Sequence, residues 1–309
     1  MNIYCIFDDY PKEAINRLLE AGIVLTVHPK GKSRPNNTEM KMILQEYDGV
    51  IIGTSQRINE DMFEGIDDPR IIATASVGLD HIHVPENKKK HVTIINTPTA
   101  NARSVAEYTI GCFLSCTKRF AEGKNLYLEG KNNKQLSKKP GDIYGKSLGV
   151  IGAGNISREI MLMAKMLGMN VFFWTPHPEN HIDLHKDGMT YREFDQLISE
   201  SDYISVNLPN NEGTKDLISE RVVSIMKEDA VFVSVSRLPT VNLRALVEKA
   251  EQSRDFYVCL DIDVDDSVVS QLPNLPNLQL TPHIAGGTTE TRIRMFNEIA
   301  SMLVGIVED

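Results

Sequence analysis

The sequence predicts an α/β protein with two doubly wound parallel sheets, and two observations lead to this prediction. Short, continuously apolar runs rich in Val and Ile alternate with amphipathic helical patterns along the 309 residues. Strands of this kind are typical of a parallel sheet that is covered by helices on both faces. A polar stretch at residues 130–145 interrupts the alternation, which then starts again. We therefore expect two α/β domains rather than one.

The first series of strands starts near the N-terminus and is interrupted by helical patterns such as PKEAINRLLEAG. Its expected strands are NIYCIF, IVLTV, GVIIG, RIIATA and VTIIN. A long apolar helix, SVAEYTIGCFLSCTKRF, follows them. The closing segment, TTETRIRMFNEIASMLVGIVE, has an apolar stripe at helical spacing, and we assign it to the first domain. That domain is thus predicted to comprise residues 1–98 plus 287–309.

The second series of strands lies after the polar stretch. Its expected strands are SLGVIG, NVFFW, YISVN, AVFVSV, YVCLDI and LQLT. A glycine-rich turn follows the first of them, which is where doubly wound sheets bind nucleotides. We therefore predict a nucleotide-binding domain over residues 99–286.

Composition limits the partners that this chain is expected to have. It is 41% hydrophobic and 24% charged, as usual for a globular protein, and its formal charge is -9 at pH 7. An acidic protein repels nucleic acid and anionic lipid unless it has a local basic patch, and the lysine-rich stretch KNNKQLSKK is interpreted as solvated surface. No apolar run reaches 18 residues and the N-terminus lacks a basic segment, so we expect neither a membrane span nor a secretory signal.

The four cysteines contain no C-x-x-C pair. Cys112 and Cys116 are four residues apart on an expected helix and could hold a metal, but buried free thiols are the favoured interpretation. We accordingly expect a cytoplasmic protein without a metal site.

The stretch GVIGAGNIS, residues 149–157, predicts a pyrophosphate site. Gly152 and Gly154 stand between an apolar strand and the helical run SREIMLMAKMLG, which is the context of a dinucleotide-binding turn. The first glycine permits the tight turn and the second lets the backbone approach the phosphates. Ser157 replaces the third glycine, whose task is close helix–strand contact, so we expect binding to survive with a slight displacement of the helix.

The end of the next strand, NVFFW, bears on the choice of cofactor. An acidic residue there normally accepts hydrogen bonds from the ribose 2′-hydroxyl of NAD. Here the strand is followed by Thr175, and the histidines His177 and His181 come soon after it. The missing carboxylate removes repulsion of a 2′-phosphate, but TPHPENHIDLH contains no arginine to attract one. The sequence thus favours NADP slightly over NAD.

Three later strands are each followed by a residue that can take part in catalysis. Arg237 follows VFVSV, Asp261 ends YVCLD and is followed five residues later by Asp266, and His283 follows LQLT. The carboxyl ends of parallel strands converge on the ligand crevice. A guanidinium, a carboxylate and an imidazole suit the oxidation of a hydroxy acid, in which the imidazole accepts the hydroxyl proton. Each residue alone could simply cap a loop, but three of them beside a nucleotide turn favour catalysis.

The chain resembles the D-isomer-specific 2-hydroxyacid dehydrogenases almost from end to end. This family is related to phosphoglycerate dehydrogenase, glyoxylate/hydroxypyruvate reductase and formate dehydrogenase. The motifs that carry the resemblance are TASVGLDHI, NTPTANARSVAEYTIG, LGVIGAGNIS, NLPNNEGTKDLI and LTPHIAGGT. The resemblance implies a flavodoxin-like substrate domain, a Rossmann nucleotide domain and a homodimer built around the latter.

The resemblance also implies roles for individual residues. Arg237 would bind the substrate carboxylate or carbonyl, His283 would be the acid/base with Asp266 as its partner, and the backbone amides of Val77 and Gly78 would hold the substrate carboxylate. The implied cofactor contacts are Val105, Gly152, Ala153, Gly154, Asn155, Ile156, Thr175, Asn207, Pro209, Val235, Ser236, Arg237, Asp261, His283 and Gly286.

Four departures from the family pattern affect rate or substrate more than fold. Ser157 replaces a glycine, Thr175 replaces an acid, and Asp266 is one methylene shorter than the usual glutamate. In SRLPTVN, Leu238 and Asn242 stand in place of the family's usual residues.

We expect an NAD(P)-dependent oxidoreductase that acts on a small D-2-hydroxy acid or reduces the 2-oxo acid. The alternative is a nucleotide-binding regulatory protein on the same fold. A formate-type enzyme is disfavoured because its chemistry gives a carboxylate paired with the histidine no clear task.

Overall fold

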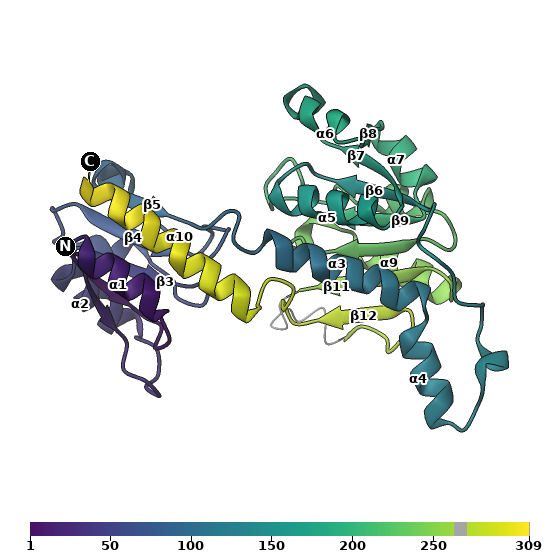
Figure 1. The fold of residues 1–309 in the computed structure, drawn as a ribbon, viewed down its shortest axis with the longest axis horizontal. Coiled ribbons are helices and arrows are strands. Elements are labelled where there is room, and N and C mark those ends of the chain that lie inside the picture. The colour runs from purple at the N-terminus through teal and green to yellow at the C-terminus, as the bar shows by residue number, and fades with distance from the viewer. Residues whose placement is uncertain (263–270, 309) are drawn as a thin grey trace. The chain divides into compact units, whose positions relative to one another are not determined.

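The computed structural model describes residues 1–262 and 271–308. The chain divides into two compact units, one of Met1–Asn101 with Thr288–Asp309 and the other of Ala102–Gly287. Each is an α/β unit with a single parallel sheet (Figure 1). The fold class predicted from the alternating strands is therefore confirmed. The units change after residues 101 and 287, and the sequence-based boundaries lie after residues 98 and 286.

The sheet of the first unit has five parallel strands in the order β2-β1-β3-β4-β5. This is the flavodoxin-like order of a doubly wound sheet. The strands are β1 (Asn2–Cys5), β2 (Val24–Val27), β3 (Gly49–Ile52), β4 (Arg70–Thr74) and β5 (Val92–Ile95). All five correspond to apolar runs in the sequence. In the central strands β3 and β4 nearly every residue is buried, so no polar side is needed, whereas the edge strands β2 and β5 are partly exposed.

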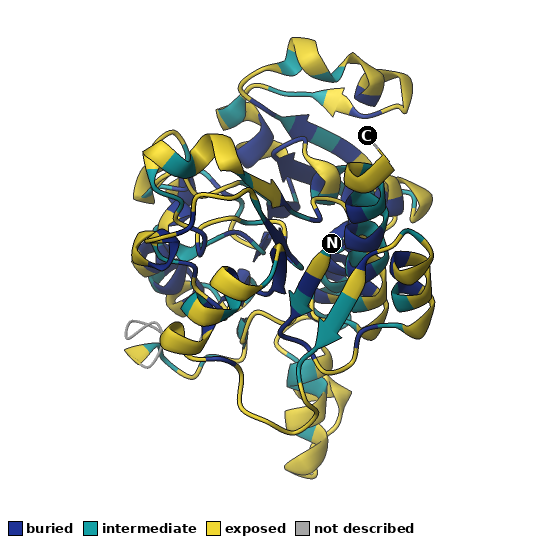
Figure 2. Cartoon of the chain, turned by 90° about the vertical axis from the view of Figure 1, so that its left-hand side faces the viewer, coloured by how far each residue is buried: buried dark blue, intermediate teal, exposed yellow. Residues whose placement is uncertain are grey.

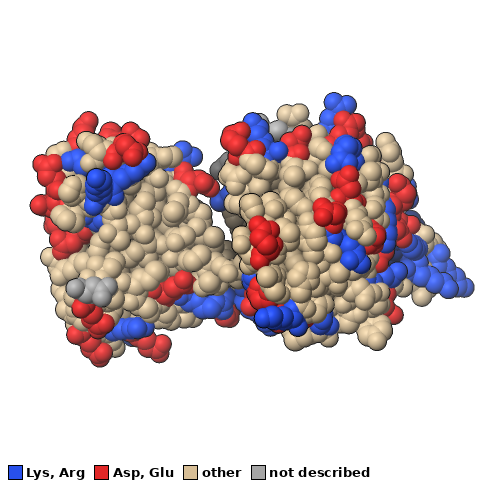
Figure 3. Space-filling model, turned by 90° about the horizontal axis from the view of Figure 1, so that it is seen from above, with Lys and Arg blue, Asp and Glu red and all other residues tan. Residues whose placement is uncertain are grey.

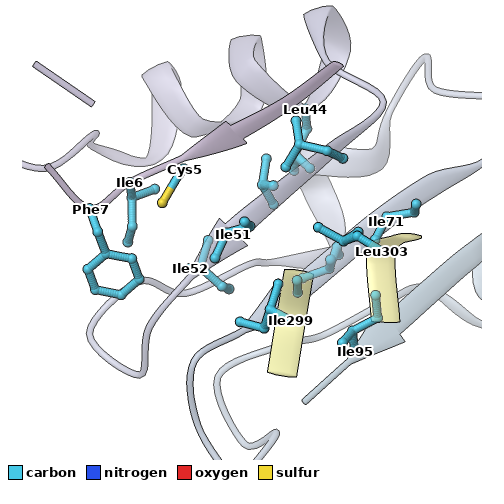
Figure 4. Close-up of a cluster of buried hydrophobic side chains, with 14 of the residues drawn as sticks. Cys5, Ile6, Phe7, Leu44, Ile51, Ile52, Ile71, Ile95, Ile299 and Leu303 are labelled. Atoms are coloured by element: carbon cyan, nitrogen blue, oxygen red, sulfur yellow. The ribbon is translucent and has the colours of Figure 1, made fainter. Parts of the chain in front are cut away.

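The helices of the first unit are α1 (Lys12–Glu20), α2 (Asn37–Glu46) and α10 (Thr289–Glu308), with the 3₁₀ turns η1 (Glu60–Phe63) and η2 (Glu86–His91). Asn36 begins α2 in a capping box with Glu39, which satisfies amides at the helix start. The closing helix α10 belongs to this unit and packs beside α1. Figure 4 shows Leu303 of α10 near Ile71 of β4 and Ile299 near Ile52 of β3, within one apolar cluster. Apolar burial thus holds the C-terminal helix on the first sheet.

The sheet of the second unit has seven parallel strands in the order β12-β11-β10-β9-β6-β7-β8. Read from β8 with β6 counted as strand 1, the order begins as 3-2-1-4-5-6, which is the Rossmann order. The strands are β6 (Ser147–Ile151), β7 (Asn170–Trp174), β8 (Thr190–Tyr191), β9 (Tyr203–Val206), β10 (Val231–Ser234), β11 (Tyr257–Asp261) and β12 (Leu278–Thr281). The sequence pattern missed β8, because two residues are too short to show a periodicity.

The helices of the second unit cover both faces of this sheet. They are α3 (Ala102–Thr117), α4 (Phe120–Leu128), α5 (Asn155–Met166), α6 (Ile182–Lys186), α7 (Phe194–Glu200), α8 (Glu220–Ser224) and α9 (Leu243–Gln252), with the 3₁₀ turns η3 (Asn133–Gln135), η4 (Pro178–His181) and η5 (Leu238–Thr240). Along β10, Val231 and Val233 join one apolar cluster with Phe113 of α3, whereas Phe232 joins another with Leu246 of α9. The central strand β10 therefore buries both of its faces, whereas β7 and β8 toward one edge keep exposed residues. Figure 2 shows buried strand segments in dark blue.

Charged side chains of both signs are intermingled on the face that Figure 3 presents. The lysine-rich segment at residues 131–139 is exposed almost throughout, as its interpretation as solvated surface requires. Within the described ranges, no helix is both long and apolar enough to cross a lipid bilayer. All four cysteines are buried free thiols.

Candidate active site

The turn between β6 and α5 demands glycine at its first position. Gly152 has φ 106°, a backbone conformation that residues with a side chain rarely adopt. A Cβ atom at Gly152 would lie 2.6 Å from the carbonyl oxygen of Asn207 in the loop after β9. The amide of Gly152 donates to the carbonyl of Trp174 at 2.9 Å. The turn is thus in close contact with the ends of both neighbouring strands, β7 and β9.

The second glycine faces open space. A Cβ at Gly154 would meet no atom within 4 Å, although Gly154 directly precedes α5 and no side chain caps the helix start. The first amides of a helix have no acceptor inside the helix and attract negative charge. Gly154 therefore leaves room for an anion to approach these amides.

Ser157, which stands where the third glycine is expected, is completely buried. Its hydroxyl has no hydrogen-bond partner among the described residues and lies 3.3 Å from the position of a Cβ on Gly152. A buried hydroxyl without a partner is unfavourable. The serine side chain therefore lies in the interior beside the turn and does not enter the open space at Gly154.

Thr175 directly follows β7 and is buried, with no hydrogen-bond partner for its hydroxyl among the described residues. An arginine that the local sequence did not reveal lies near the segment that follows. Arg158, from the first turn of α5, forms an ion pair with Asp183 and contacts Nδ1 of His181 at 3.1 Å. The segment after β7 thus has an arginine beside it, but a carboxylate already neutralises that arginine.

The loops after β9 and β10 are joined by one serine. Ser236 Oγ accepts from the amide of Leu208 at 2.7 Å and donates to the carbonyl of Val206 at 3.1 Å. The predicted cofactor residues Asn207 and Pro209 therefore lie beside Val235 and Ser236, at the same edge of the sheet. Val105 is buried in α3.

Arg237 and His283 are brought together although they lie 46 residues apart in the sequence. Arg237 follows β10, and its NH1 lies 3.0 Å from Nδ1 of His283 in the loop after β12. A guanidinium only donates hydrogen bonds, so Nδ1 accepts and the proton of the neutral ring is on Nε2. The sequence-based expectation that the carboxyl ends of these strands would converge holds for this pair.

Asp261, at the end of β11, is turned toward the loop that carries His283. Its Oδ1 accepts from the hydroxyl of Thr281 at 2.6 Å and the amide of Ile284 at 2.8 Å, and its Oδ2 accepts from the amide of Ala285 at 2.8 Å. This carboxylate, which is only 4% exposed, holds both ends of the turn. Gly286 follows directly. Asp266, the predicted carboxylate partner of His283, lies outside the described residues.

The unusual residues of SRLPTVN have structural tasks. Leu238 packs against the apolar cluster under α9. Asn242 caps α9, since its side chain accepts from the amide of Ala245 at 3.0 Å. An asparagine side chain caps a helix about as well as an aspartate. These substitutions therefore keep the helix that follows Arg237 in place.

In the first unit, the loop after β4 presents two amides. The carbonyl of Val77 accepts from Asn96 Nδ2 at 2.9 Å, and the carbonyl of Gly78 accepts from Ser76 Oγ at 2.8 Å. Ser76 is buried with Thr74, whose hydroxyl also contacts His81 Nε2 at 2.9 Å. The amides of Val77 and Gly78 donate to no acceptor within the described part of the chain. The loop is thus fixed through its carbonyls while its amides stay available.

A sequence model of the D-isomer specific 2-hydroxyacid dehydrogenase NAD binding domain matches residues 110–285, more than half of the chain. The chain belongs to the D-isomer specific 2-hydroxyacid dehydrogenase family. It is 32% identical over 270 residues to a hydroxypyruvate reductase of Thermotoga maritima, covering 86% of both chains. The enzyme is thus an oxidoreductase that interconverts a 2-hydroxy acid and a 2-oxo acid with a nicotinamide cofactor.

Two solved structures share the fold of the dehydrogenase. A D-lactate dehydrogenase from Aquifex aeolicus, complexed with NAD and lactic acid, has a TM-score of 0.79 and 23% identity, covering 100% of this chain and 96% of that one. An acyclic imino acid reductase in complex with NADPH and D-Arg has a TM-score of 0.80 and 23% identity, covering 97% and 94%.

The turn of the dehydrogenase fits a dinucleotide. Gly152 is confined by Asn207, so the turn is as tight as the fingerprint requires, and the open space at Gly154 lies before an uncapped helix start. The unpartnered Ser157 hydroxyl remains buried below the turn rather than in the space above it. These residues would hold a pyrophosphate through backbone amides.

Sequence reasoning missed the residues that support this site. Arg158 lies 23 residues from His181, and Thr281 lies 20 residues from Asp261. The buried Thr74 and His81 were likewise not singled out. The one sequence signal for Thr74 and Thr281 is their position as polar residues at the ends of strands. Their partners could not be predicted, because contacts across a sheet have no fixed sequence spacing.

Proposed function

We propose that His283 is the general acid/base of the dehydrogenase and that Arg237 binds the substrate carboxylate or carbonyl oxygen. The observation that carries the proposal is the 3.0 Å contact between Arg237 and His283, in the same unit as the glycine turn. A guanidinium fork matches a planar carboxylate, and an imidazole is suited to proton transfer near neutral pH.

In the direction of reduction, a bound reduced nicotinamide would provide the hydride for the 2-oxo carbon. His283 gives a proton to the carbonyl oxygen, so that the oxo acid becomes a hydroxy acid. Arg237 orients the substrate and stabilises the negative charge that develops on this oxygen. In the reverse direction His283 takes the proton of the hydroxyl group.

The Arg237–His283 contact links substrate binding to the protonation of the imidazole. A doubly protonated ring has no acceptor at Nδ1, so Arg237 cannot keep its 3.0 Å hydrogen bond once His283 is charged. A substrate carboxylate offers Arg237 a stronger, charge-assisted partner. We infer that substrate binding draws Arg237 from the ring, so that Nδ1 can take up a proton and donate it in a hydrogen bond to the carboxylate of Asp266, the partner that the family resemblance implies.

We also propose that the amides of Val77 and Gly78 bind the substrate carboxylate. Support comes from the two loop carbonyls, which are occupied by Asn96 and Ser76, whereas the amides have no acceptor among the described residues. Amides in a fixed loop are pre-oriented donors for an anion.

For the cofactor, we propose NADP with a slight preference over NAD. Thr175 places a free hydroxyl, and no carboxylate, directly after β7. Arg158 and His181 lie near the segment that follows, although Asp183 neutralises the arginine. Structures that share the fold contain NADPH in one case and NAD in another, so the fold accommodates both.

We further propose a homodimer built around the second unit. Phe120, Tyr127 and Leu128 of α4 are 63%, 82% and 72% exposed, and no residue of α4 is buried. Tyr144 and Met166 are also largely exposed. Several large apolar side chains exposed on one helix are unusual on a monomer, and a second copy would cover them. Light scattering after gel filtration tests the proposal, and a monomeric mass at micromolar concentration would overturn it.

A cytoplasmic location is proposed as well, supported by the four buried free thiols, which a reducing compartment preserves. Fractionation of cells that produce the protein would test it. Recovery outside the cytoplasmic fraction would contradict it.

The proposed function is tested by a steady-state scan of 2-oxo acids with NADH and NADPH in parallel. Glyoxylate, hydroxypyruvate and longer 2-oxo acids are the substrates to compare. We expect oxidation of at least one reduced cofactor that depends on the oxo acid and is lost in His283→Ala. Nucleotide binding without turnover of any oxo acid would favour the regulatory alternative.

A further inference from the structure

The turn that carries His283 is strained and therefore needs an anchor. His283 has φ 51°, in the left-handed region that residues other than glycine rarely occupy. Such a conformation persists only where its surroundings enforce it. Asp261 provides part of this constraint, because its carboxylate accepts from the amides of Ile284 and Ala285 at 2.8 Å each.

Thr281 is attached to the same turn at two points. Its carbonyl accepts from the amide of His283 at 3.0 Å, and its hydroxyl donates to Asp261 Oδ1 at 2.6 Å. A movement of Thr281 would therefore displace both His283 and the carboxylate that holds the turn. The hydroxyl of Thr281 has one proton, and Asp261 takes it because an ionised carboxylate can only accept.

Tyr108 of α3 extends this chain of hydrogen bonds. Its hydroxyl lies 2.6 Å from Thr281 Oγ1. Since the proton of Thr281 is given to Asp261, Thr281 accepts and Tyr108 donates. Burial raises the pKa of Tyr108, with neighbouring Cys112 and Asp261 acting in the same direction, so the phenol keeps the proton that it donates. The order of donation is thus Tyr108 to Thr281 to Asp261.

We propose that Tyr108 is a positioning residue for the reaction: through Thr281 and Asp261 it fixes the turn that carries His283. Without the phenol, the Thr281 side chain is free to rotate to another staggered position, where its hydroxyl leaves Asp261. The inference rests on the proposed acid/base role of His283. It adds a residue of α3, Tyr108, which is far in sequence from the turn that carries His283.

The first experiment compares Tyr108→Phe with a matched control, Tyr203→Phe. The hydroxyl of Tyr203 also forms a hydrogen bond with a threonine of α3, at 2.7 Å from Thr117 Oγ1. Tyr203 begins β9, however, and lies outside the candidate site. Both variants lose one such bond, and we expect similar small decreases in melting temperature. Tyr108→Phe is expected to lower kcat about two- to tenfold, the usual range for one hydrogen bond, and Tyr203→Phe less than about twofold.

The second experiment tests the order of the chain with variants of Thr281. Thr281→Ser keeps the hydroxyl and should stay within about twofold of wild-type kcat, whereas Thr281→Val should lose at least as much as Tyr108→Phe. The double variant Tyr108→Phe/Thr281→Val should be no slower than Thr281→Val alone, because the phenol acts only through Thr281. Additive losses, or equal kcat losses in Tyr108→Phe and Tyr203→Phe, would overturn the proposal.

A third measurement does not need turnover. Diethyl pyrocarbonate modifies histidines, and mass spectrometry can follow His283 against the other seven of the eight histidines. We expect Tyr108→Phe, but not Tyr203→Phe, to change the modification rate of His283. If the wild type reduces no 2-oxo acid, the proposed function fails while this rate still tests the anchor. An unchanged rate in an active Tyr108→Phe enzyme would contradict the anchor alone.

Discussion

The loop after β4 in the first unit and the loop after β12 in the second are fixed by different chemistry. The first is held by side-chain hydroxyls, since Ser76 donates to the carbonyl of Gly78 and Thr74 contacts both Ser76 and His81. The second is held by an ionised carboxylate, Asp261, with three donors. Both loops follow strands of a parallel sheet, and the second presents a titratable side chain, His283, beside the guanidinium of Arg237.

This difference indicates how the two loops are suited to two tasks. Backbone amides of a loop that is held by side-chain hydroxyls can bind an anion without changing their own charge. An imidazole that gains and loses a proton needs its backbone held by a group that does not move when the charge changes. A buried carboxylate with three hydrogen bonds meets that need, because charge-assisted bonds are stronger than neutral ones.

The largest expected effect is the difference in kcat between variants of the two histidines in these loops, His283 and His81. His283→Ala should lower kcat by about 10²–10⁴-fold, as removal of a general acid/base usually does, while NAD(P)H still binds. His81→Ala should instead raise KM and lower the melting temperature, because His81 is buried and supports the loop through Thr74.

Steady-state kinetics measure kcat and KM, cofactor titration measures NAD(P)H binding, and thermal unfolding measures the melting temperature. Equal losses of kcat in the two variants would remove the distinction between the loops. Wild-type turnover in His283→Ala would exclude His283 as the acid/base.

The second largest expected effect is the difference in steady-state kinetics between removing a charged group, Arg237, and removing a neutral one, the Ser76 hydroxyl. Arg237→Ala should lower kcat/KM by about 10- to 150-fold, since it removes a charge-assisted bond of about 1.5–3 kcal/mol, and should leave cofactor affinity nearly unchanged. Ser76→Ala removes a neutral bond and should raise KM by about two- to tenfold. Steady-state kinetics with one oxo acid provide the test. Similar losses in both variants would mean that Arg237 does not meet the substrate as a charge.

A third prediction concerns the cofactor end of the second unit. Thr175→Asp places a carboxylate after β7, where it should accept from a ribose 2′-hydroxyl and repel a 2′-phosphate. With an effective dielectric near 20, a like-charge contact at about 4 Å costs up to ~4 kcal/mol before screening. Salt and partial exposure should reduce this cost to about 1–2 kcal/mol, or a 5- to 30-fold shift toward NADH.

The measurement is the ratio of the NADPH and NADH dissociation constants in wild type and Thr175→Asp. Thr175→Ser, which keeps the hydroxyl, is the matched control. An unchanged ratio in Thr175→Asp would show that this position does not face the ribose.

The smallest effect contrasts two buried serines. Ser157→Ala should stabilise the protein by about 1 kcal/mol, because it removes a buried hydroxyl without a partner, and should raise the melting temperature by about 2–4 °C. Ser76→Ala should lower it, since that hydroxyl is bonded to Gly78 and Thr74. Calorimetry compares the two. A destabilised Ser157→Ala would mean that the hydroxyl has a partner when the protein is in solution.

Much of the fold was predictable from the sequence. Strands of a parallel sheet appear as short runs rich in apolar residues, and eleven of the described strands correspond to such runs, whereas the two-residue β8 does not. Gly152 and Gly154 were also predictable, because a tight turn and a close phosphate each require the absence of a side chain. The convergence of Arg237 with His283 followed from the rule that parallel strands end at the same edge of a sheet.

The sequence by itself determined the two parallel sheets, the glycine turn and the family, because all three depend on local residue patterns that survive without knowledge of contacts. Only the tertiary structure decided which side chains meet. The neutralisation of Arg158 by Asp183, the clamp of Asp261 on the His283 turn and the hydrogen bond from Tyr108 to Thr281 each join residues 20 to 173 positions apart. Such contacts are set by how helices lie on a sheet, and the spacing of residues along the chain does not encode them.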